Sequence, residues 1–368
     1  MVRQIILTIL LLNAQICFAN MASPITKGTS SGSAFSSRDI DILSETIHIK
    51  VSPDFKTASF KVDYRIQCKA DGRQIPLLFL AQQYSGDFKV RVDGQHVNVQ
   101  DVPAKYDFSQ GSPFFQFSQA FPDRISHGEA ATTIIHWDEQ SGSLYQLRDL
   151  KYFETSLRKG VHQIQVEYIA STWVDRSAWV KVYSLPYALM PAKYWNSFGT
   201  LTIALDASGF SKVLQSNLGK PQRGRMDAIA YWSFDKLPLD YLQISYTPEI
   251  SNVLAKILIQ LTPDCLSLFL GLLLMILHLF WLIRHKRVNP GQRMNRHLLL
   301  GSIIVPFLGI LCYLYSFELI DQLIGPEASR FHGYTFLVWV IYPVLVLGYW
   351  LICNAFLLLF AKKGEVKQ

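Results

Sequence analysis

The sequence has little cysteine, and its placement excludes one common way of stabilising an exported protein. Four of the five cysteines lie in or beside apolar runs at the two ends of the chain, namely Cys17, Cys265, Cys312 and Cys353. Only Cys68 remains between them, so no disulfide can form within that region. The chain also has no Asn-x-Ser/Thr glycosylation acceptor. Both absences fit a bacterial envelope slightly better than a eukaryotic lumen.

Charge is also scarce, at 17% of residues against a usual quarter, while 50% of residues are hydrophobic. The formal net charge is +7, and much of the excess lies in residues 284–296 and in Lys362, Lys363 and Lys367. Cations placed beside apolar runs indicate membrane topology rather than a surface for polyanions. We therefore expect no nucleic-acid partner.

The usual active-site motifs are missing. The chain contains no Gly-x-Ser-x-Gly, His-Glu-x-x-His, Walker loop, Gly-x-Gly-x-x-Gly or Cys-x-x-Cys. The densest polar cluster matches no metal-ligand spacing and lies in a turn-rich segment: His127, Glu129, His136, Asp138 and Glu139. We assign no catalytic residue, no metal site and no cofactor from the sequence.

The N-terminus has the pattern of a secretory signal peptide in residues 1–19. Arg3 precedes an apolar run from Ile5 to Leu12, and a small residue, Ala19, ends the segment. The run is too short to span a bilayer; the alternative is an uncleaved anchor. Residues 20–44, rich in Ser, Gly, Thr and Ala, are predicted to be a flexible leader.

Residues 45–248 show the alternating pattern of β-strands. In residues 60–68 apolar side chains alternate with polar ones, which places Cys68 on the buried face. Asp93-Gly94 between two alternating runs predicts a hairpin. About ten to twelve short strands predict an all-β ectodomain, an antiparallel β-sandwich or two in tandem. Residues 101–148 would hold the boundary between two domains.

From residue 249 the hydrophobic period becomes helical. Residues 249–262 form an amphipathic pattern that predicts a helix at the membrane–water interface; the alternative is a helix packed on the β part. Residues 263–283, 298–318 and 334–360 are each long enough to cross a bilayer, which predicts a three-helix α-helical transmembrane bundle. Pro263 would be the joint between the interfacial helix and the first span.

The connections between these spans predict the topology. Residues 284–297 are rich in Lys and Arg and lack acids, residues 319–333 together with the adjoining Glu318 hold three acids and one Arg, and residues 361–368 are basic. The positive-inside rule then places the N-terminal domain in the periplasm or outside the cell, and the C-terminus in the cytoplasm. We expect a multi-pass protein of the cytoplasmic membrane, with the lipid bilayer as one partner.

Two groups of residues are candidates for recognition. The aromatic segment 183–195 contains Tyr187, Tyr194 and Trp195, which suit contact with a partner when exposed; the alternative is that they pack inside the β part. The polar side chains within the spans are Asp264, His278, Glu318 and Asn354. The first three lie near span ends, where polar groups reach water, whereas Asn354 lies deeper and suits a bond between helices.

These features favour a binding or assembly role. The ectodomain would contact a partner, and the spans would associate with other membrane or envelope proteins. One alternative is a membrane-associated enzyme with a site at the boundary between ectodomain and bilayer, using residues such as His136 and Asp138. Another is an accessory subunit of a receptor or transporter, since no cytoplasmic segment is long enough for a signalling domain.

Overall fold

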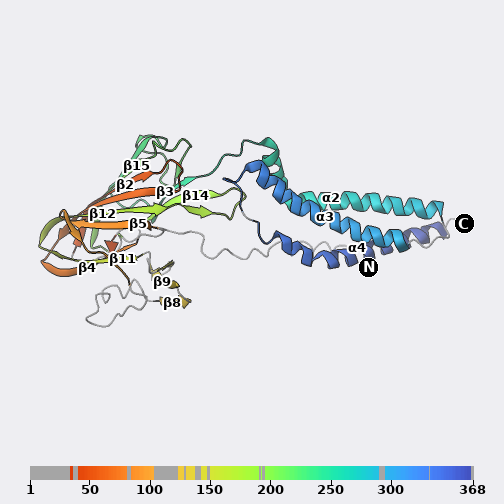
Figure 1. Cartoon of the computed structure of the whole chain (residues 1–368), viewed down its shortest axis with the longest axis horizontal. Coiled ribbons are helices and arrows are strands. Elements are labelled where there is room, and N and C mark those ends of the chain that lie inside the picture. Colours follow the sequence, from red (N-terminus) through yellow and green to blue (C-terminus); the bar gives the residue numbers. More distant parts are fainter. Residues whose placement is uncertain are drawn as a thin grey trace. The chain divides into compact units, whose positions relative to one another are not determined.

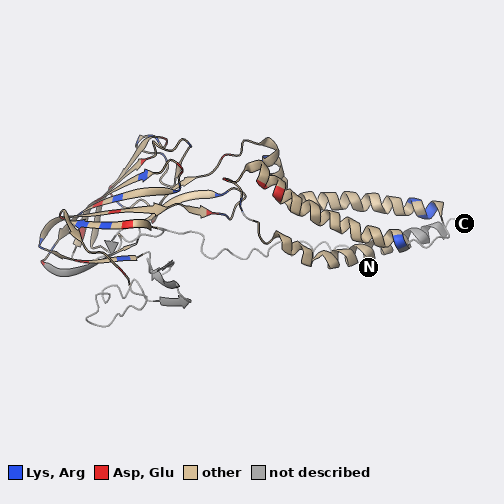
Figure 2. Ribbon diagram, viewed as in Figure 1, with Lys and Arg blue, Asp and Glu red and all other residues tan. Residues whose placement is uncertain are grey.

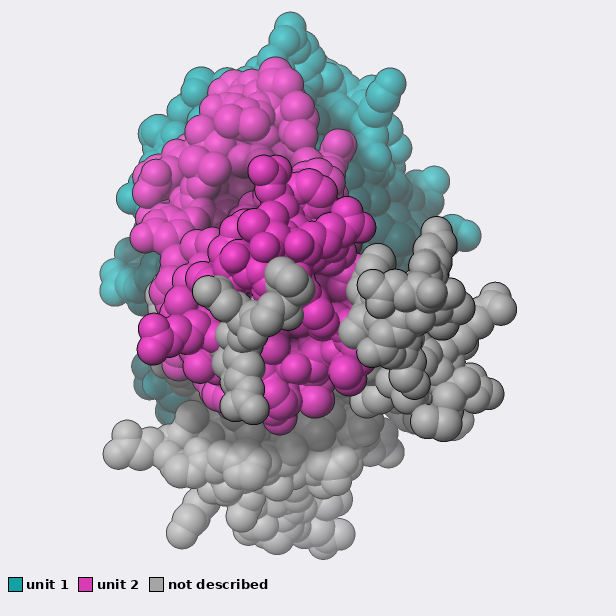
Figure 3. All heavy atoms as spheres, turned by 90° about the vertical axis from the view of Figure 1, so that its right-hand side faces the viewer, with its two compact units in different colours: residues 1–177, 182–246 teal, residues 178–181, 247–368 magenta. Residues whose placement is uncertain are grey.

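The computed structural model (Figure 1) describes residues 34–35, 40–80, 84–102, 123–127, 130–136, 142–146, 150–189, 192, 195–289, 295–330 and 332–365. The chain forms two compact units, which Figure 3 colours separately. One comprises residues 1–177 and 182–246, and the other comprises residues 178–181 and 247–368. The predicted signal peptide, residues 1–19, lies outside the described residues.

The first unit is mostly β-sheet, as the alternating sequence pattern predicts. Its largest sheet has eight strands in the order β17-β18-β15-β2-β3-β12-β5-β6. The bounds are β2 Ile40–Val51, β3 Thr57–Cys68, β5 Tyr84–Val92, β6 Gln95–Val97, β12 Gly160–Ser171, β15 Ser197–Asp206, β17 Arg223–Gly224 and β18 Ile229–Phe234. β2 starts inside residues 20–44, so its strand begins within the segment predicted to be a flexible leader.

Three smaller sheets complete the described β-strands. Their orders are β13-β14-β19-β16, β1-β4-β11-β7 and β10-β9-β8. The bounds are β1 Ala34–Phe35, β4 Gly72–Leu80, β7 Gln100–Asp101, β8 Asp123–His127, β9 Ala130–His136, β10 Gly142–Gln146, β11 Leu150–Leu157, β13 Trp173–Asp175, β14 Val182–Ala188, β16 Gln215–Ser216 and β19 Tyr241–Tyr246.

Strand pairing is antiparallel apart from one pair among the described strands. β2 and β15 are parallel, with Ile47 opposite Ile203. The sequence predicts antiparallel pairing throughout, because turn signals report only neighbouring strands. A parallel pair needs a long crossover connection, which leaves no local signature.

One hydrophobic core joins the eight-stranded sheet to the sheets that contain β14 and β4. The Phe60 ring stacks on Tyr168 at 5.1 Å and on Tyr187 at 6.0 Å. Cys68 is buried, as its place in the alternation predicts. The predicted hairpin is also confirmed, since Asp93 and Gly94 both have positive φ, at 49° and 79°, between β5 and β6.

A bulge in β2 decides which of its side chains face the core. The pairing of β2 with β3 shifts between Ile42 and Ser44, so the buried positions change from Ile42 to Glu45. Gly199 of β15 lies opposite the bulge, where a Cβ atom would stand 2.1 Å from the carbonyl oxygen of Leu43. Only glycine fits that approach of two backbones.

The second unit is helical. Its elements are α2 Val253–Val288, α3 Asn295–Ile324, the 3₁₀ helix η5 Thr335–Val340 and α4 Tyr342–Glu365. α2 and α3 are long and apolar enough to cross a membrane, and α4 contains a shorter apolar stretch, Tyr342–Leu358. The three-helix transmembrane bundle therefore stays a prediction, while two long apolar helices after a β-rich part are shown.

α2 is broken near its start. Asn252 caps it, because its side chain accepts hydrogen bonds from the backbone N–H groups of Leu254 and Ala255 at 2.9 and 3.2 Å. Thr262 has non-helical angles, φ 57° and ψ 149°, immediately before Pro263. Proline lacks an N–H donor and its ring clashes with the preceding turn, so the helix changes direction there.

Candidate functional site

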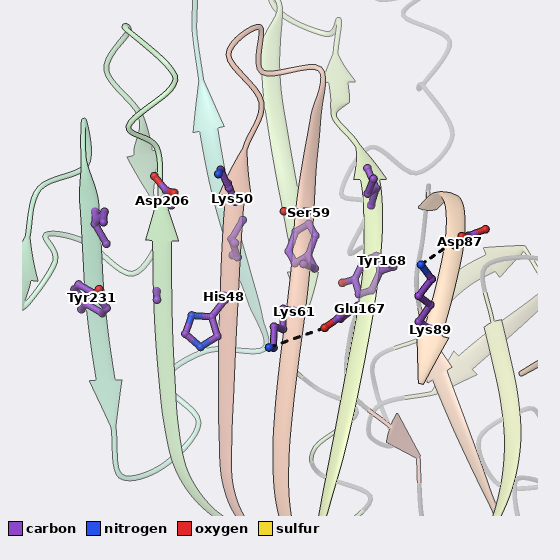
Figure 4. Close-up of a pocket in the computed structure, with 15 residues that line it drawn as sticks. His48, Lys50, Ser59, Lys61, Asp87, Lys89, Glu167, Tyr168, Asp206 and Tyr231 are labelled. Atoms are coloured by element: carbon purple, nitrogen blue, oxygen red, sulfur yellow. Dashed lines mark ion pairs between the residues drawn. The ribbon is translucent and has the colours of Figure 1, made fainter. Parts of the chain in front are cut away.

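The outward face of the eight-stranded sheet carries a shallow groove with a cavity volume of about 660 Å³. Its lining comes from six strands, β18, β15, β2, β3, β12 and β5 (Figure 4). Alternate side chains of each strand face the core, so the intervening ones face the groove. The groove is thus the solvent-facing surface of the same strands that build the interior.

Strand register aligns groove residues from distant parts of the sequence into one row. Going across the sheet, the row contains Tyr231, Ala204, His48, Lys61, Glu167 and Lys89. Neighbouring strands are about 4.8 Å apart, so six strands place the ends of this row about 24 Å apart. The row is long enough for an extended ligand.

A second row runs beside the first, two residues away from it in each strand except β5, where a bulge makes the step four residues. It contains Ile229, Asp206, Lys50, Ser59, Ile169 and Ser85. Isolated apolar side chains alternate here with donors and acceptors. The groove is therefore neither an apolar patch nor a block of one charge.

Four of the six charged groups that line the groove form two ion pairs. Lys61 lies 4.0 Å from Glu167, and Lys89 lies 3.5 Å from Asp87 (Figure 4, dashed lines). Hydrogen bonds from the Ser208 hydroxyl and backbone hold the pKa of Asp206 below its usual range. The lining thus contains three lysines, including Lys50, and three carboxylates, so its formal charges balance.

A bulge in β5 shapes one side of the groove. The pairing of β5 with β12 shifts between Glu167 and Ile169, so three residues of β5 oppose the single residue Tyr168. Gly86 supplies the positive φ of 81° that this bend requires. Bulges bend a strand and re-aim its side chains, and Asp87 and Lys89 line the groove beside this one.

The inward face of the same sheet holds a buried carboxyl. Glu45 of β2 has no exposed surface, and the Tyr187 hydroxyl donates to its Oε1 at 2.8 Å. The Tyr64 hydroxyl lies 3.1 Å from that of Tyr187. Burial raises the pKa of Glu45 to about 7, although the two tyrosine hydroxyls act in the opposite direction. The carboxyl is sealed inside the core and faces no groove.

The aromatic residues proposed for recognition lie inside the β part where they are described. Tyr187 is fully buried in the Glu45 network, and Trp195 is 5% exposed. Tyr194 lies outside the described residues. The placements of Tyr187 and Trp195 are those of the packing alternative. Tyr187 does have a polar role, because it hydrogen-bonds a buried carboxyl.

The polar residues of the helices have unequal surroundings. His278 of α2 has its Nδ1 2.9 Å from the Tyr349 hydroxyl of α4 and its Nε2 3.4 Å from the His297 carbonyl of α3. It therefore links three helices, and Gly301 leaves the space for its ring. Asn354, expected to bond between helices, donates to the Trp350 carbonyl of its own helix at 2.8 Å.

Asp264 and Glu318 are exposed within the helical unit. Glu318 accepts a hydrogen bond of 2.9 Å from Gln322 of the same helix. Because such charges are costly in hydrocarbon, their exposure suits the ends of apolar segments. Neither residue hydrogen-bonds His278 in the described helices, so the four polar residues form no single site there.

The structure describes no group of three or more His, Cys, Asp or Glu residues that is arranged to hold a metal. In the polar cluster singled out from the sequence, His127 and His136 end β8 and β9. The side chains of that cluster lie outside the described residues, so its chemistry stays a prediction.

Sequence reasoning missed the groove and the buried carboxyl. Alternation places Lys61 on the polar face of its strand, but only register places it beside Glu167, which is over a hundred residues away. Glu45 belongs to a polar-looking strand start, and the bulge turns it inward. The signal that could have been used was Gly199, a glycine near the start of an otherwise alternating strand.

Comparisons with known proteins give no family. No family model matches the chain, and no curated protein matches it. Among solved structures, an M1 zinc metallopeptidase from Deinococcus radiodurans is 13% identical with a TM-score of 0.28, over 57% of this chain and 43% of that one. Native yeast LTA4 hydrolase is 9% identical with a TM-score of 0.31, over 60% and 31%. The chain covers less than half of either, and TM-scores this low carry no functional meaning.

Proposed function

We propose that the protein is a membrane-anchored binding module, in which the outward face of the eight-stranded sheet holds a partner. The observation that carries this proposal is the groove, where six strands present two rows of charged, polar and single apolar side chains. Concave sites of this size, lined by a few placed polar groups, are typical of ligand binding.

The finer architecture is part of the same proposal. The β part is a β-sandwich ectodomain, and α2, α3 and α4 form a three-helix bundle in the cytoplasmic membrane of the cell envelope. Support comes from the apolar length of α2 and α3 and from the basic last turn of α2, which contains His285, Lys286 and Arg287. Figure 2 shows Lys and Arg at that end of α2 and few charges along the helices.

This orientation places the groove outside the cytoplasm and the basic turn inside. Residues 1–19 direct export, and other membrane or envelope proteins associate with the bundle. His278, which contacts residues of α3 and α4, stabilises the bundle that such subunits would meet.

The test is site-specific crosslinking in cells. A photo-crosslinking residue at Lys61 lies in the groove, and one at Lys56 is an exposed lysine in the β2–β3 connection outside it. Position 61 is expected to capture a partner or ligand that position 56 does not. Adducts that are identical at both positions, or none from position 61 in a folded protein, would overturn the proposal.

A further inference from the structure

We propose that the groove binds an uncharged, hydroxyl-rich glycan chain that lies across the strands, with the Tyr231 ring as its stacking surface. This inference rests on the proposed binding function and adds the chemical class of the ligand. Four properties of the groove carry it: its balanced charge, its exposed ring, its mixture of donors and acceptors, and the closed backbone of its floor.

The charge balance selects against ionic ligands. Lys61 pairs with Glu167 and Lys89 pairs with Asp87, while Lys50 and Asp206 face each other in the register of β2 and β15. A phosphate-rich or polyacidic partner would find as many repelling carboxylates as attracting lysines. A neutral ligand does not need to break the pairs.

The exposed ring suits a sugar. Tyr231 lies at one end of the first row and is 38% exposed, with the Arg223 guanidinium 5.8 Å from its ring centroid. A cation against one side of an aromatic ring holds that ring in place. A tyrosine ring offers an apolar surface with a polar tip, which fits the C–H face of a pyranose next to its hydroxyl groups.

Sugar hydroxyls both donate and accept hydrogen bonds, so they need both kinds of partner within reach. The groove provides donors at Lys50 and Lys61, acceptors at Asp206 and Glu167, and a hydroxyl at Ser59, all on one sheet face. Their spacing follows the strand spacing of about 4.8 Å, which is close to the repeat of a sugar ring.

The groove floor excludes strand addition by a peptide. β2, β3 and β12 each have a paired strand on both sides, so their backbone groups are already used in the ladder. Peptides that add to a sheet need a free edge. The apolar groups Ile169 and Ile229 stand apart in the second row, so the groove lacks the continuous apolar surface that a lipid tail would need.

The experiment is calorimetric titration of the full chain in a mild detergent with defined probes. The probes are the neutral tetramers chitotetraose, cellotetraose and maltotetraose, with octaglutamate and octalysine as ionic comparators. At least one neutral tetramer is expected to bind, with an affinity that high salt leaves unchanged. Preferential binding of an ionic probe, or binding that salt abolishes, would overturn the glycan assignment.

Single substitutions test whether the tetramer binds in the groove, against the Tyr231 ring. Tyr231→Ala is expected to weaken affinity about ten-fold, while Tyr231→Phe keeps the ring and the affinity. Thr46→Ala lies on the same face of β2 as His48 but outside the groove lining, so it is the matched control and leaves affinity unchanged. Equal affinity in Tyr231→Ala and the wild type would remove Tyr231 as the stacking surface.

The two proposals fail in different ways. If no neutral tetramer binds and position 61 still captures a partner in cells, the glycan assignment is wrong and the binding module stands. If neither experiment detects a ligand, both are wrong. A tetramer that binds equally well to the wild type, Tyr231→Ala and Thr46→Ala binds elsewhere, which overturns the groove as its site.

Discussion

The two faces of the eight-stranded sheet place a glutamate carboxyl in opposite environments. On the inward face Glu45 is sealed in the core, and burial raises its pKa to about 7. On the outward face Glu167 is partly exposed, with Lys61 at 4.0 Å and the Arg91 guanidinium at 3.5 Å. Burial in the core favours the neutral acid at Glu45, whereas the outward carboxyl is within reach of water and two cations.

The inward carboxyl therefore affects the stability of the fold, whereas the outward side chains are available for binding. The inward carboxyl affects folding, because its protonation changes the free energy of unfolding with pH. The outward pairs contribute little to folding, since exposed ion pairs are typically worth less than about 1 kcal/mol. Outward positions are therefore open to selection for ligand contacts, while inward positions are constrained by the core.

The largest loss of stability is expected from a substitution that disturbs the bulge that turns Glu45 inward. Gly199→Ala places a Cβ atom 2.1 Å from the Leu43 carbonyl oxygen, and no rotamer change relieves a clash with backbone. We expect a destabilisation of about 4 kcal/mol or loss of the fold, measured by thermal unfolding of the full chain in detergent.

The control for that variant is Gly209→Ala. Its added Cβ would meet only the Pro53 side chain, at an ordinary 3.6 Å. It should unfold close to the wild-type temperature. Similar losses in Gly199→Ala and Gly209→Ala would mean that the bulge does not require glycine.

The next effect is a pH dependence of stability. Burial on folding raises the pKa of Glu45 from its ordinary value of 4.5 to about 7. The folded state then keeps a proton that the unfolded state loses, so stability is full below pH 4.5, falls as pH rises, and levels off above about 7. The total loss is on the order of 3 kcal/mol.

Glu45→Gln removes this titration, so its unfolding free energy should change less between about pH 4 and pH 8 than that of the wild type. Denaturant unfolding at several pH values measures the slope. Glu167→Gln on the outward face is the comparison and should leave the slope intact. A wild-type slope that survives in Glu45→Gln would assign the titration to another group.

A smaller effect is expected from the hydrogen bond to Glu45. Tyr187→Phe removes the hydroxyl that donates to Oε1 at 2.8 Å, and Oε2 has no hydrogen-bond partner in the described part of the chain. The loss should be about 1–2 kcal/mol, because a buried acceptor loses its donor. It should also raise the Glu45 pKa further, which moves the pH-dependent fall in stability upward. Tyr231→Phe on the outward face should change stability by far less.

The smallest effect belongs to the outward ion pair. Lys61→Ala should change the unfolding free energy by about 0.5 kcal/mol or less, and the difference should shrink at high salt. Denaturant unfolding at low and high salt measures it. A loss comparable to that of Tyr187→Phe would show that the two faces do not differ in the way described.

Local patterns predicted much of the fold. The alternation of residues 60–68 predicted β3 and the burial of Cys68, and Asp93-Gly94 predicted the turn between β5 and β6. Apolar length predicted α2 and α3. These features depend on the spacing of neighbouring residues, which is present in the sequence itself.

The groove and the Glu45 network could not be predicted in this way. The groove needs Tyr231, His48 and Glu167 in one row, and that row depends on pairings between strands far apart in the chain. The parallel strands β2 and β15 are not joined by a short turn, so no local sequence signal predicts their pairing. The sequence left open whether Tyr187 is exposed or packed, and it is buried because its strand contributes to the shared core.

The order of the parts, a β-rich region followed by apolar helices, can be read from local patterns, because hydrophobic period and run length depend only on neighbouring residues. Tertiary structure decided which carboxyl is sealed and which is exposed. A one-residue bulge opposite Gly199 reverses the facing of every later residue in β2, since side chains alternate along a strand. Register then places Lys61 beside Glu167 on one face and Tyr187 beside Glu45 on the other.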